Sequence, residues 1–206
     1  MRFRLTLAVY LLFSLGDLRA SSIPAFNVSG GALDFTDFQY TIGDQFSTTQ
    51  AITVTDLGVY SVTGLAQGYE VGLWNSSGVL LVSATVPSTA QAGQFVYVPI
   101  NPVSLAADQT FQIGELINST ATWLASPSVD SAPGIVFDHG VYDLGFNATL
   151  TDPTTDDIGS SLGSTFGPSF EFTPVPEPVT SWPLAGFIIL MFRWGQKRSS
   201  AGNRRP

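Results

Sequence analysis

Two strand-like segments joined by a turn decide the fold: YEVGLW at residues 69–74, NSSG at 75–78 and VLLVSATV at 79–86. In the first segment Val71 and Leu73 occupy alternate positions, as they do in a strand that buries one face. Asn and Gly in the middle segment favour the backbone conformations of a hairpin turn. The stretch therefore predicts an antiparallel hairpin, whose second strand ends at Pro87.

Similar short segments lie on both sides of this hairpin. Further strands are expected at 52–59, 95–100, 110–113 and 166–172. A change of phase at Thr55-Asp56 predicts a β-bulge, and Asn101-Pro102 is expected to break the strand before it. No long stretch has the 3.6-residue period of an amphipathic helix. We expect an all-β, jelly-roll-like β-sandwich over residues 23–173, mostly strand from Phe35 to Phe172.

The charged residues are distributed unevenly along the chain. All eight Lys and Arg residues lie near the two ends, and none lies between Ala20 and Phe192. Fifteen of the sixteen acids lie in that middle region. A body without basic residues cannot neutralise phosphates, so we expect it to bind neither nucleic acid nor an anionic membrane surface. The chain has no cysteine, which leaves packing rather than disulfides to hold the fold.

The N-terminal residues are typical of a secretory signal peptide. Arg2 and Arg4 precede an apolar run over residues 5–15, which is too short to cross a bilayer comfortably. Small residues at Ala20 and Ser22 predict cleavage before Ile23, with cleavage after Ala20 as the second choice. The expected signal peptide is 1–22, and an uncleaved anchor helix is the alternative.

The C-terminal residues 174–206 form three successive parts. A proline-rich motif at 175–178 is followed by an apolar segment at 179–192 and a basic tail at 193–206. The prolines keep the motif extended and outside regular structure, which suits a peptide bound by a processing enzyme. The basic tail is expected to stay on the cytoplasmic side of the membrane, which places the body on the other side.

This ordered triple resembles a PEP-CTERM sorting signal, a segment also named the ice-binding protein C-terminal domain. The resemblance covers about residues 174–206 and implies recognition of Pro176, Glu177 and Pro178 by an exosortase, a membrane-embedded processing enzyme. It also implies a Gram-negative host that makes extracellular polysaccharide. The apolar segment departs from a full span, because about fourteen residues give a helix of only ~21 Å against ~30 Å of hydrocarbon. A proline-rich stem on a short apolar tail is the alternative.

A second resemblance concerns about Tyr40 to Glu115. Short motifs recur there in order: Phe46-Ser47-Thr48-Thr49, Val71-Gly72-Leu73-Trp74-Asn75 and Phe95-Val96-Tyr97-Val98-Pro99-Ile100. This region is similar to a secreted bacterial β-sandwich domain of unknown function. The resemblance implies a jelly-roll-like module that is often attached to other extracellular parts, and it transfers no catalytic residue.

Aromatic residues are the candidates for sugar binding. Trp74 falls out of phase with Val71 and Leu73, and Trp123 lies between Ser- and Thr-rich stretches. Both could present a ring for stacking on a carbohydrate, as could Tyr69 and Tyr97. Packing in the core is the alternative for each.

Acidic residues and the single histidine are the candidates for other chemistry. Asp152, Asp156 and Asp157, in a stretch low in hydrophobic residues, could bind Ca²⁺, although their spacing is not that of an EF-hand. His139 lies near Asp138 and Asp143 and could belong to a Ser-His-Asp arrangement, but no Gly-x-Ser-x-Gly motif accompanies it. Asp34 with Asp37, or Asp138 with Asp143, could form the carboxylate pair of a glycosidase. Solvated acids and a solvated histidine are the alternative.

These observations predict how the protein is delivered better than what it binds. We expect export by the secretion machinery, transient anchoring in the inner membrane through the C-terminal helix only, exosortase processing, and display at the cell surface or in the extracellular matrix. The body is expected to be a non-enzymatic structural or adhesive component associated with exopolysaccharide. A carbohydrate-binding module is the alternative, and a carboxylate-based glycan hydrolase a more distant one.

Overall fold

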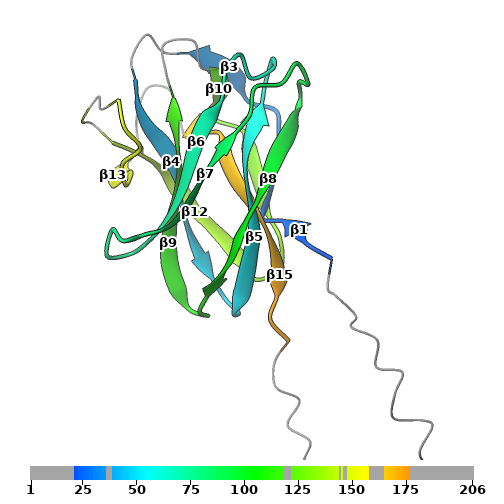
Figure 1. Cartoon of the computed structure of the whole chain (residues 1–206), viewed down its shortest axis with the longest axis vertical. Helices are drawn as coiled ribbons and strands as arrows, with labels where there is room; N and C mark the ends of the chain where they lie inside the picture. The colour runs from blue at the N-terminus through cyan, green and yellow to red at the C-terminus, as the bar shows by residue number, and fades with distance from the viewer. Residues whose placement is uncertain are drawn as a thin grey trace, which may run out of the picture. The chain divides into compact units, whose positions relative to one another are not determined.

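A computed structural model describes residues 21–35, 39–117, 122–143, 145, 148–157 and 165–176. Every regular element in these ranges is a β-strand, which confirms the all-β prediction (Figure 1). The strands are β1 (Ile23–Pro24), β2 (Phe26–Ser29), β3 (Ala32–Phe35), β4 (Tyr40–Thr48), β5 (Ile52–Ser61), β6 (Tyr69–Asn75), β7 (Leu80–Val86), β8 (Gln94–Leu105), β9 (Gln109–Ile117), β10 (Thr122–Ala125), β11 (Ser128–Ser131), β12 (Ile135–Tyr142), β13 (Thr155–Asp156), β14 (Thr165–Phe166) and β15 (Pro168–Pro174).

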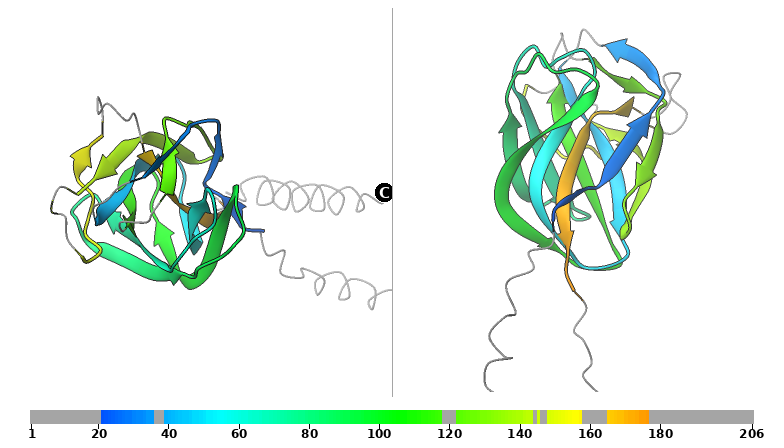
Figure 2. Two further views of the ribbon diagram at one scale, coloured as in Figure 1. Left: turned by 90° about the horizontal axis from the view of Figure 1, so that it is seen from above. Right: turned by 90° about the vertical axis from the view of Figure 1, so that its right-hand side faces the viewer.

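Two large antiparallel sheets contain most of these strands. One has the order β13-β12-β4-β9-β6-β7, and the other has the order β1-β15-β5-β8. Two small sheets, β14-β10-β3 and β11-β2, complete the arrangement. The large sheets form two layers, as the views in Figure 2 show, and the hydrophobic core contains side chains from both.

The hairpin that decides the fold is confirmed. β6 pairs with β7 from Tyr69 opposite Val86 to Trp74 opposite Leu80. The side-chain oxygen of Asn75 accepts hydrogen bonds from the amides of Ser77 and Val79, both at 3.0 Å. Gly78 has a φ of 74°, a left-handed conformation that glycine adopts without strain. The turn therefore depends on the Asn and the Gly that predicted it.

The predicted bulge at Thr55-Asp56 is also confirmed. The register between β5 and β8 shifts between Val54 and Asp56. The register between β15 and β5 shifts at the same place, between Glu171 and Phe172. The extra residue explains why the buried positions change phase: Val54 faces the core before the bulge and Leu57 faces it afterwards.

The predicted end of the strand at Asn101-Pro102 is wrong, because β8 continues through both residues to Leu105. The pairing with β5 is nevertheless interrupted there, since Val103 lies opposite Val54 and the next paired residue, Pro99, lies opposite Asp56. β8 is the last strand of its sheet and pairs with β5 alone. A proline at a sheet edge can direct its missing amide donor away from the ladder. The proline is therefore tolerated here, although it would interrupt a central strand.

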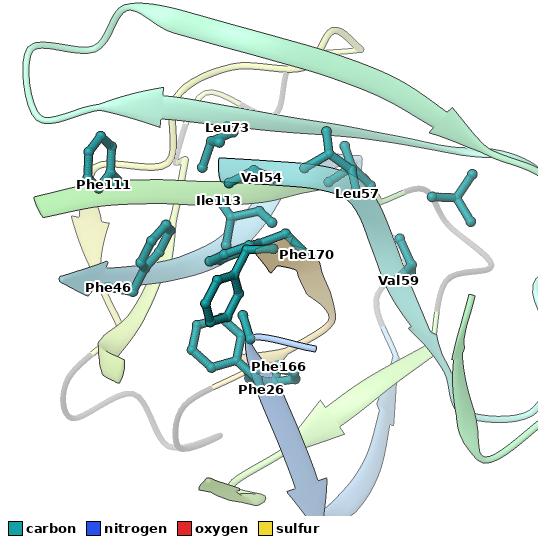
Figure 3. Close-up of a cluster of buried hydrophobic side chains, with 14 of the residues drawn as sticks. Phe26, Phe46, Val54, Leu57, Val59, Leu73, Phe111, Ile113, Phe166 and Phe170 are labelled. Atoms are coloured by element: carbon teal, nitrogen blue, oxygen red, sulfur yellow. The ribbon is translucent and has the colours of Figure 1, made fainter. Parts of the chain in front are cut away.

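Phe26 is completely buried and packs against the cluster of core side chains, next to Phe166 (Figure 3). Its ring meets four others edge-on, at centroid distances of 5.7 to 6.1 Å, namely those of Phe46, Phe137, Phe166 and Phe170. Phe46 belongs to the six-stranded sheet and Phe170 to the four-stranded sheet. Edge-to-face contacts of this kind add to the stability gained from burial alone. Phe26 therefore joins the two layers.

The first and last strands of the domain lie side by side. β1 pairs with β15, with Ile23 opposite Phe172. The amide of Val175 donates to the carbonyl of Ala51 at 3.0 Å and extends the ordered chain one residue past β15. The predicted signal helix and C-terminal helix lie outside the described residues. Within the described part of the chain, no helix has the length and apolar character needed to cross a membrane.

Replacing Phe26 with alanine should strongly destabilise the domain. The change removes a completely buried ring and its four aromatic contacts, so we expect a loss of about 3–5 kcal/mol in the free energy of unfolding, measured by urea denaturation. Leu33→Ala is the control, because Leu33 is 56% exposed and should change stability by no more than about 0.5 kcal/mol. Equal effects of the two substitutions would contradict the central place given to Phe26.

Candidate functional site

Trp74 is buried, with 3% of its surface exposed, so its predicted role as an exposed sugar platform is wrong. The missing side chain of Gly72 leaves room for the indole, since a Cβ at Gly72 would collide with the ring. Leu150, from the segment before β13, would lie 2.9 Å from the same Cβ position. Leu150, which is distant in the sequence, thus covers the face of β6 that the alternation of Val71 and Leu73 predicted to be exposed to solvent.

Trp123 is also buried, with 1% of its surface exposed. It lies in β10 opposite Asp34 of β3, and it belongs to the main hydrophobic core. Its role as an exposed sugar platform is therefore wrong as well. Tyr69 is buried at 3% exposure, so it offers no ring to a ligand either.

Half-buried aromatic side chains remain on β5 and β8, where Tyr60, Phe95 and Tyr97 form a small cluster. The rings of Phe95 and Tyr97 stack on each other at 5.6 Å, and Tyr60 meets Phe95 edge-on at 5.0 Å. The hydroxyl of Tyr97 donates to that of Ser169 at 3.3 Å, and burial raises the pKa of Tyr97. Much of this aromatic surface is therefore used within the protein.

The three aspartates predicted to bind Ca²⁺ do not come together. Asp156 accepts from His139, while the amide of Asp157 donates to the carbonyl of Gly140 at 2.9 Å. Asp152 lies near the β6–β7 turn, with Oδ2 3.1 Å from the position of a Cβ at Gly78. No group of three Asp, Glu, His or Cys side chains in the described ranges is arranged to hold a metal ion.

The segment that carries these aspartates packs against the sheet at its beginning. Pro153 is buried, and its Cγ lies 3.0 Å from the position of a Cβ at Gly114. The first residues of this segment, which include β13, are therefore held against the sheet although the stretch is low in hydrophobic residues. Residues 158–164 lie outside the described part of the chain.

His139 makes a hydrogen bond with Asp156, whose oxygen lies 3.0 Å from Nε2. The two aspartates near His139 in the sequence make other hydrogen bonds. Asp138 accepts one from the hydroxyl of Ser47 at 2.7 Å, and Asp143 accepts one from the hydroxyl of Thr151 at 2.6 Å. The described hydrogen bonds thus connect Ser47 to Asp138 rather than to His139. Asp34 lies in β3, and Asp37 is outside the described residues.

Two acids that the sequence analysis missed lie in the core. Asp44 is completely buried, and Glu115 is 2% exposed. Asp44 shares the inner face of β4 with Ile42 and Phe46, and Glu115 shares the inner face of β9 with Ile113. The signal was present in the sequence, because each acid is in phase with its apolar neighbours. The high content of acids in the body made both residues look like ordinary surface charges.

Three of the four carboxyl oxygens of these acids lack a hydrogen-bond partner. Both carboxyl oxygens of Asp44 and Oε2 of Glu115 are buried without a partner. Burial raises the pKa of Asp44 well above its ordinary value, and repulsion from Glu115 and Asp157 raises it further. Burial raises the pKa of Glu115 to about 8. The pair is sealed from solvent, so it does not present the accessible acid and base that hydrolysis of a glycan requires.

Comparison with known families identifies the chain as a member of one whose role is undefined. The family described as "Domain of unknown function (DUF4082)" matches residues 31–156. This range spans more than half of the chain, so the chain belongs to that family. The search of curated proteins found no match.

Solved structures give only weak likenesses. The chain is 13% identical to a protein in the crystal structure of the T13 IBDV viral particle, over 78% of this chain and 42% of that one, with a TM-score of 0.26. It is 16% identical to the VP2 subviral particle protein of infectious bursal disease virus, over 87% and 47%, with a TM-score of 0.18. The chain spans less than half the length of these proteins, and such scores say nothing about its function.

Burial of both body tryptophans can be measured by fluorescence. In a Trp182→Phe, Trp194→Phe variant, emission comes from Trp74 and Trp123 alone. We expect blue-shifted emission and acrylamide quenching several-fold weaker in the folded protein than in urea, because solvent does not reach either indole. Equal quenching in the two states would show that at least one ring is exposed and would restore the stacking hypothesis.

Proposed function

We propose that the chain is an exported surface or extracellular-matrix protein that an exosortase sorts through Pro176, Glu177 and Pro178. The body is a jelly-roll-like β-sandwich that serves as a non-enzymatic structural or adhesive component associated with exopolysaccharide. The signal peptide delivers it to the secretion machinery, and the apolar segment with its basic tail holds it transiently in the inner membrane. The host implied by this signal is a Gram-negative bacterium.

The observation that carries the proposal is where the folded domain ends. β15 ends at Pro174, Val175 makes the last backbone hydrogen bond of the described residues, and Pro176 is exposed. The contacts within the chain divide it at the same place, into units of 1–175 and 176–206. The regular structure of the described residues thus ends before the sorting motif. This placement supports a motif that an enzyme can bind while the body stays folded.

The N-terminal boundary supports the same organisation. β1 begins at Ile23, the residue that follows the expected cleavage site. The hydroxyl of Ser22 donates to Glu171 at 2.9 Å at the edge of the sheet. Cleavage before Ile23 would leave the β1–β15 pairing intact, and cleavage after Ala20 would also keep the Ser22 contact. Both expected mature forms preserve the domain.

A structural or adhesive role fits the body better than sugar binding through aromatic rings. Both candidate tryptophans are buried, and the half-buried rings of Phe95 and Tyr97 are stacked on each other. The fifteen acids and the absence of Lys and Arg between residues 20 and 192 keep the body soluble and repelled by anionic surfaces. These features favour a neutral or cation-bridged polysaccharide as the surrounding material.

Two sets of substitutions should separate recognition from retention. Replacing Pro176, Glu177 and Pro178 with alanine should trap the full-length chain at the inner membrane, because the processing enzyme loses its recognition element. Replacing the five basic residues of 193–206 with glutamine should instead weaken retention, because the apolar segment is short and the tail no longer fixes its cytoplasmic end. Cell fractionation, with antibodies to the body and the tail, distinguishes the two outcomes.

A matched control removes two prolines and a glutamate from the body surface. Pro99, Pro102 and Glu70 are all exposed, and their joint replacement by alanine should leave processing and location unchanged. If both tail variants mature and localise like the parent in a host with an exosortase, residues 174–206 are not a sorting signal.

A further inference from the structure

The buried acids Asp44 and Glu115 are neighbours on adjacent strands. In the pairing of β4 with β9, Asp44 lies opposite Ile113 and Ile42 lies opposite Glu115. The two acids are therefore diagonal neighbours on the same inner face, within reach of each other. Asp157 lies on the other side of Asp44, because its amide bonds to Gly140 and Gly140 is opposite Asp44. Three carboxyl groups thus follow one another across the sheet.

No basic side chain balances these groups. The body has neither Lys nor Arg between residues 20 and 192, and His139 is paired with Asp156. An ionised carboxylate buried without a partner is strongly unfavourable, whereas the neutral acid loses much less on leaving water. The described side chains also form no three-residue metal site. A bound proton is thus the simplest way for this interior to accommodate Asp44 and Glu115.

Glu115 also holds a junction between strands. Gly167 connects β14 to β15, and a Cβ at this residue would collide with the Glu115 carboxyl group. The carbonyl of Gly167 accepts from the amide of Tyr60 in β5 at 2.7 Å. The Glu115 carboxyl group therefore packs between β9 and the backbone that leads into β15. A charge placed there draws water toward this junction.

We propose that Asp44 and Glu115 form a proton-dependent latch: as neutral acids they hold the β14–β15 junction against β9, and ionisation of Glu115 loosens it. The other titratable groups that act on the pair are Asp157, after β13, and Tyr69 of β6. β12 contributes Gly140 beside Asp44, and the β14–β15 junction contributes Gly167 beside Glu115, so neither adds a charge at these points. Each titratable neighbour is neutral or negative, so none of them offsets a charge on Glu115.

The direction of the effect follows from proton binding. Because the pKa of Glu115 is raised to about 8 in the folded chain, the folded state holds more protons than the unfolded state between the ordinary carboxyl pKa, 4.5, and 8. The stabilisation that the neutral acid preserves is complete below pH 4.5 and is lost as the pH rises through 8. The domain should therefore be most stable in acidic surroundings.

The test compares the full-length chain with Glu115→Gln and with the control Glu70→Gln, whose parent residue is an exposed acid on β6. Urea unfolding is measured from pH 5 to pH 8.5. For the parent and the control, we expect the folding equilibrium constant to fall by more than about two orders of magnitude over this range. In Glu115→Gln the part of that fall that Glu115 causes should disappear, because the amide carries no charge at any of these pH values. The part that Asp44 causes should remain, since burial raises its pKa as well, and Asp44→Asn should remove that part instead.

Hydrogen exchange tests the latch in the unmodified chain and needs no variant to fold. After correction for the intrinsic pH dependence, protection of the Tyr60 amide should fall by at least tenfold from pH 5.5 to pH 8. Protection of the Asn75 amide in the β6–β7 turn should change less. Equal changes at both amides, or identical pH profiles for the parent and Glu115→Gln, would overturn the proposal. Stabilisation at pH 8 by Ca²⁺ that a chelator reverses and Glu115→Gln abolishes would also overturn it, in favour of a cation site.

Discussion

The apolar contact between the two large sheets is the interaction on which the rest of the structure depends. The chain has no cysteine to form a disulfide, and the body has no Lys or Arg to form salt bridges. The contact of His139 with Asp156 involves an aspartate side chain that is 63% exposed, so it contributes little. Packing around Phe26 must therefore supply most of the stability. The strands, the sheet edges and the closing pair β1–β15 all hold their places because this core is filled.

This dependence makes the acids of the core significant. A domain held together by packing alone has little stability in reserve for a buried charge. Asp44 and Glu115 nevertheless occupy inward positions among apolar side chains, without hydrogen-bond partners for three of their four oxygens. The expected repulsion of anionic partners and the proposed protonation of the interior have one origin. Both follow from the same composition, in which acids are plentiful and every Lys and Arg lies near one of the two ends of the chain.

Local sequence signals predicted local structure well. The hairpin at 69–86 and the bulge at Thr55 follow from turn chemistry and from the two-residue period, which act within a few residues. Signals that depend on distant contacts failed. A proline in a strand-like run predicts the end of the strand at Pro102. The strand continues because Pro102 lies at a sheet edge, and that position is set by the topology rather than by local sequence. The alternation of Val71 and Leu73 predicts that Trp74 faces solvent. In the structure its face is covered by Leu150, seventy-six residues later, and local sequence gives no sign of this contact. Glu115 was missed for a different reason: it is in phase with its apolar neighbours, but the many acids of the body made it look like a surface charge.

The most direct test of the central claim is the intact mass of the protein from a Gram-negative host with and without its exosortase. With the enzyme, the account predicts a surface or secreted polypeptide that begins at Ile23, or at Ser21, and ends close to Pro176-Glu177-Pro178. Without the enzyme, the chain should keep its C-terminus at Pro206 and stay with the inner membrane. A surface form that retains Pro206 in both hosts would contradict the claim, because the folded domain would then reach its destination without the segment proposed to sort it.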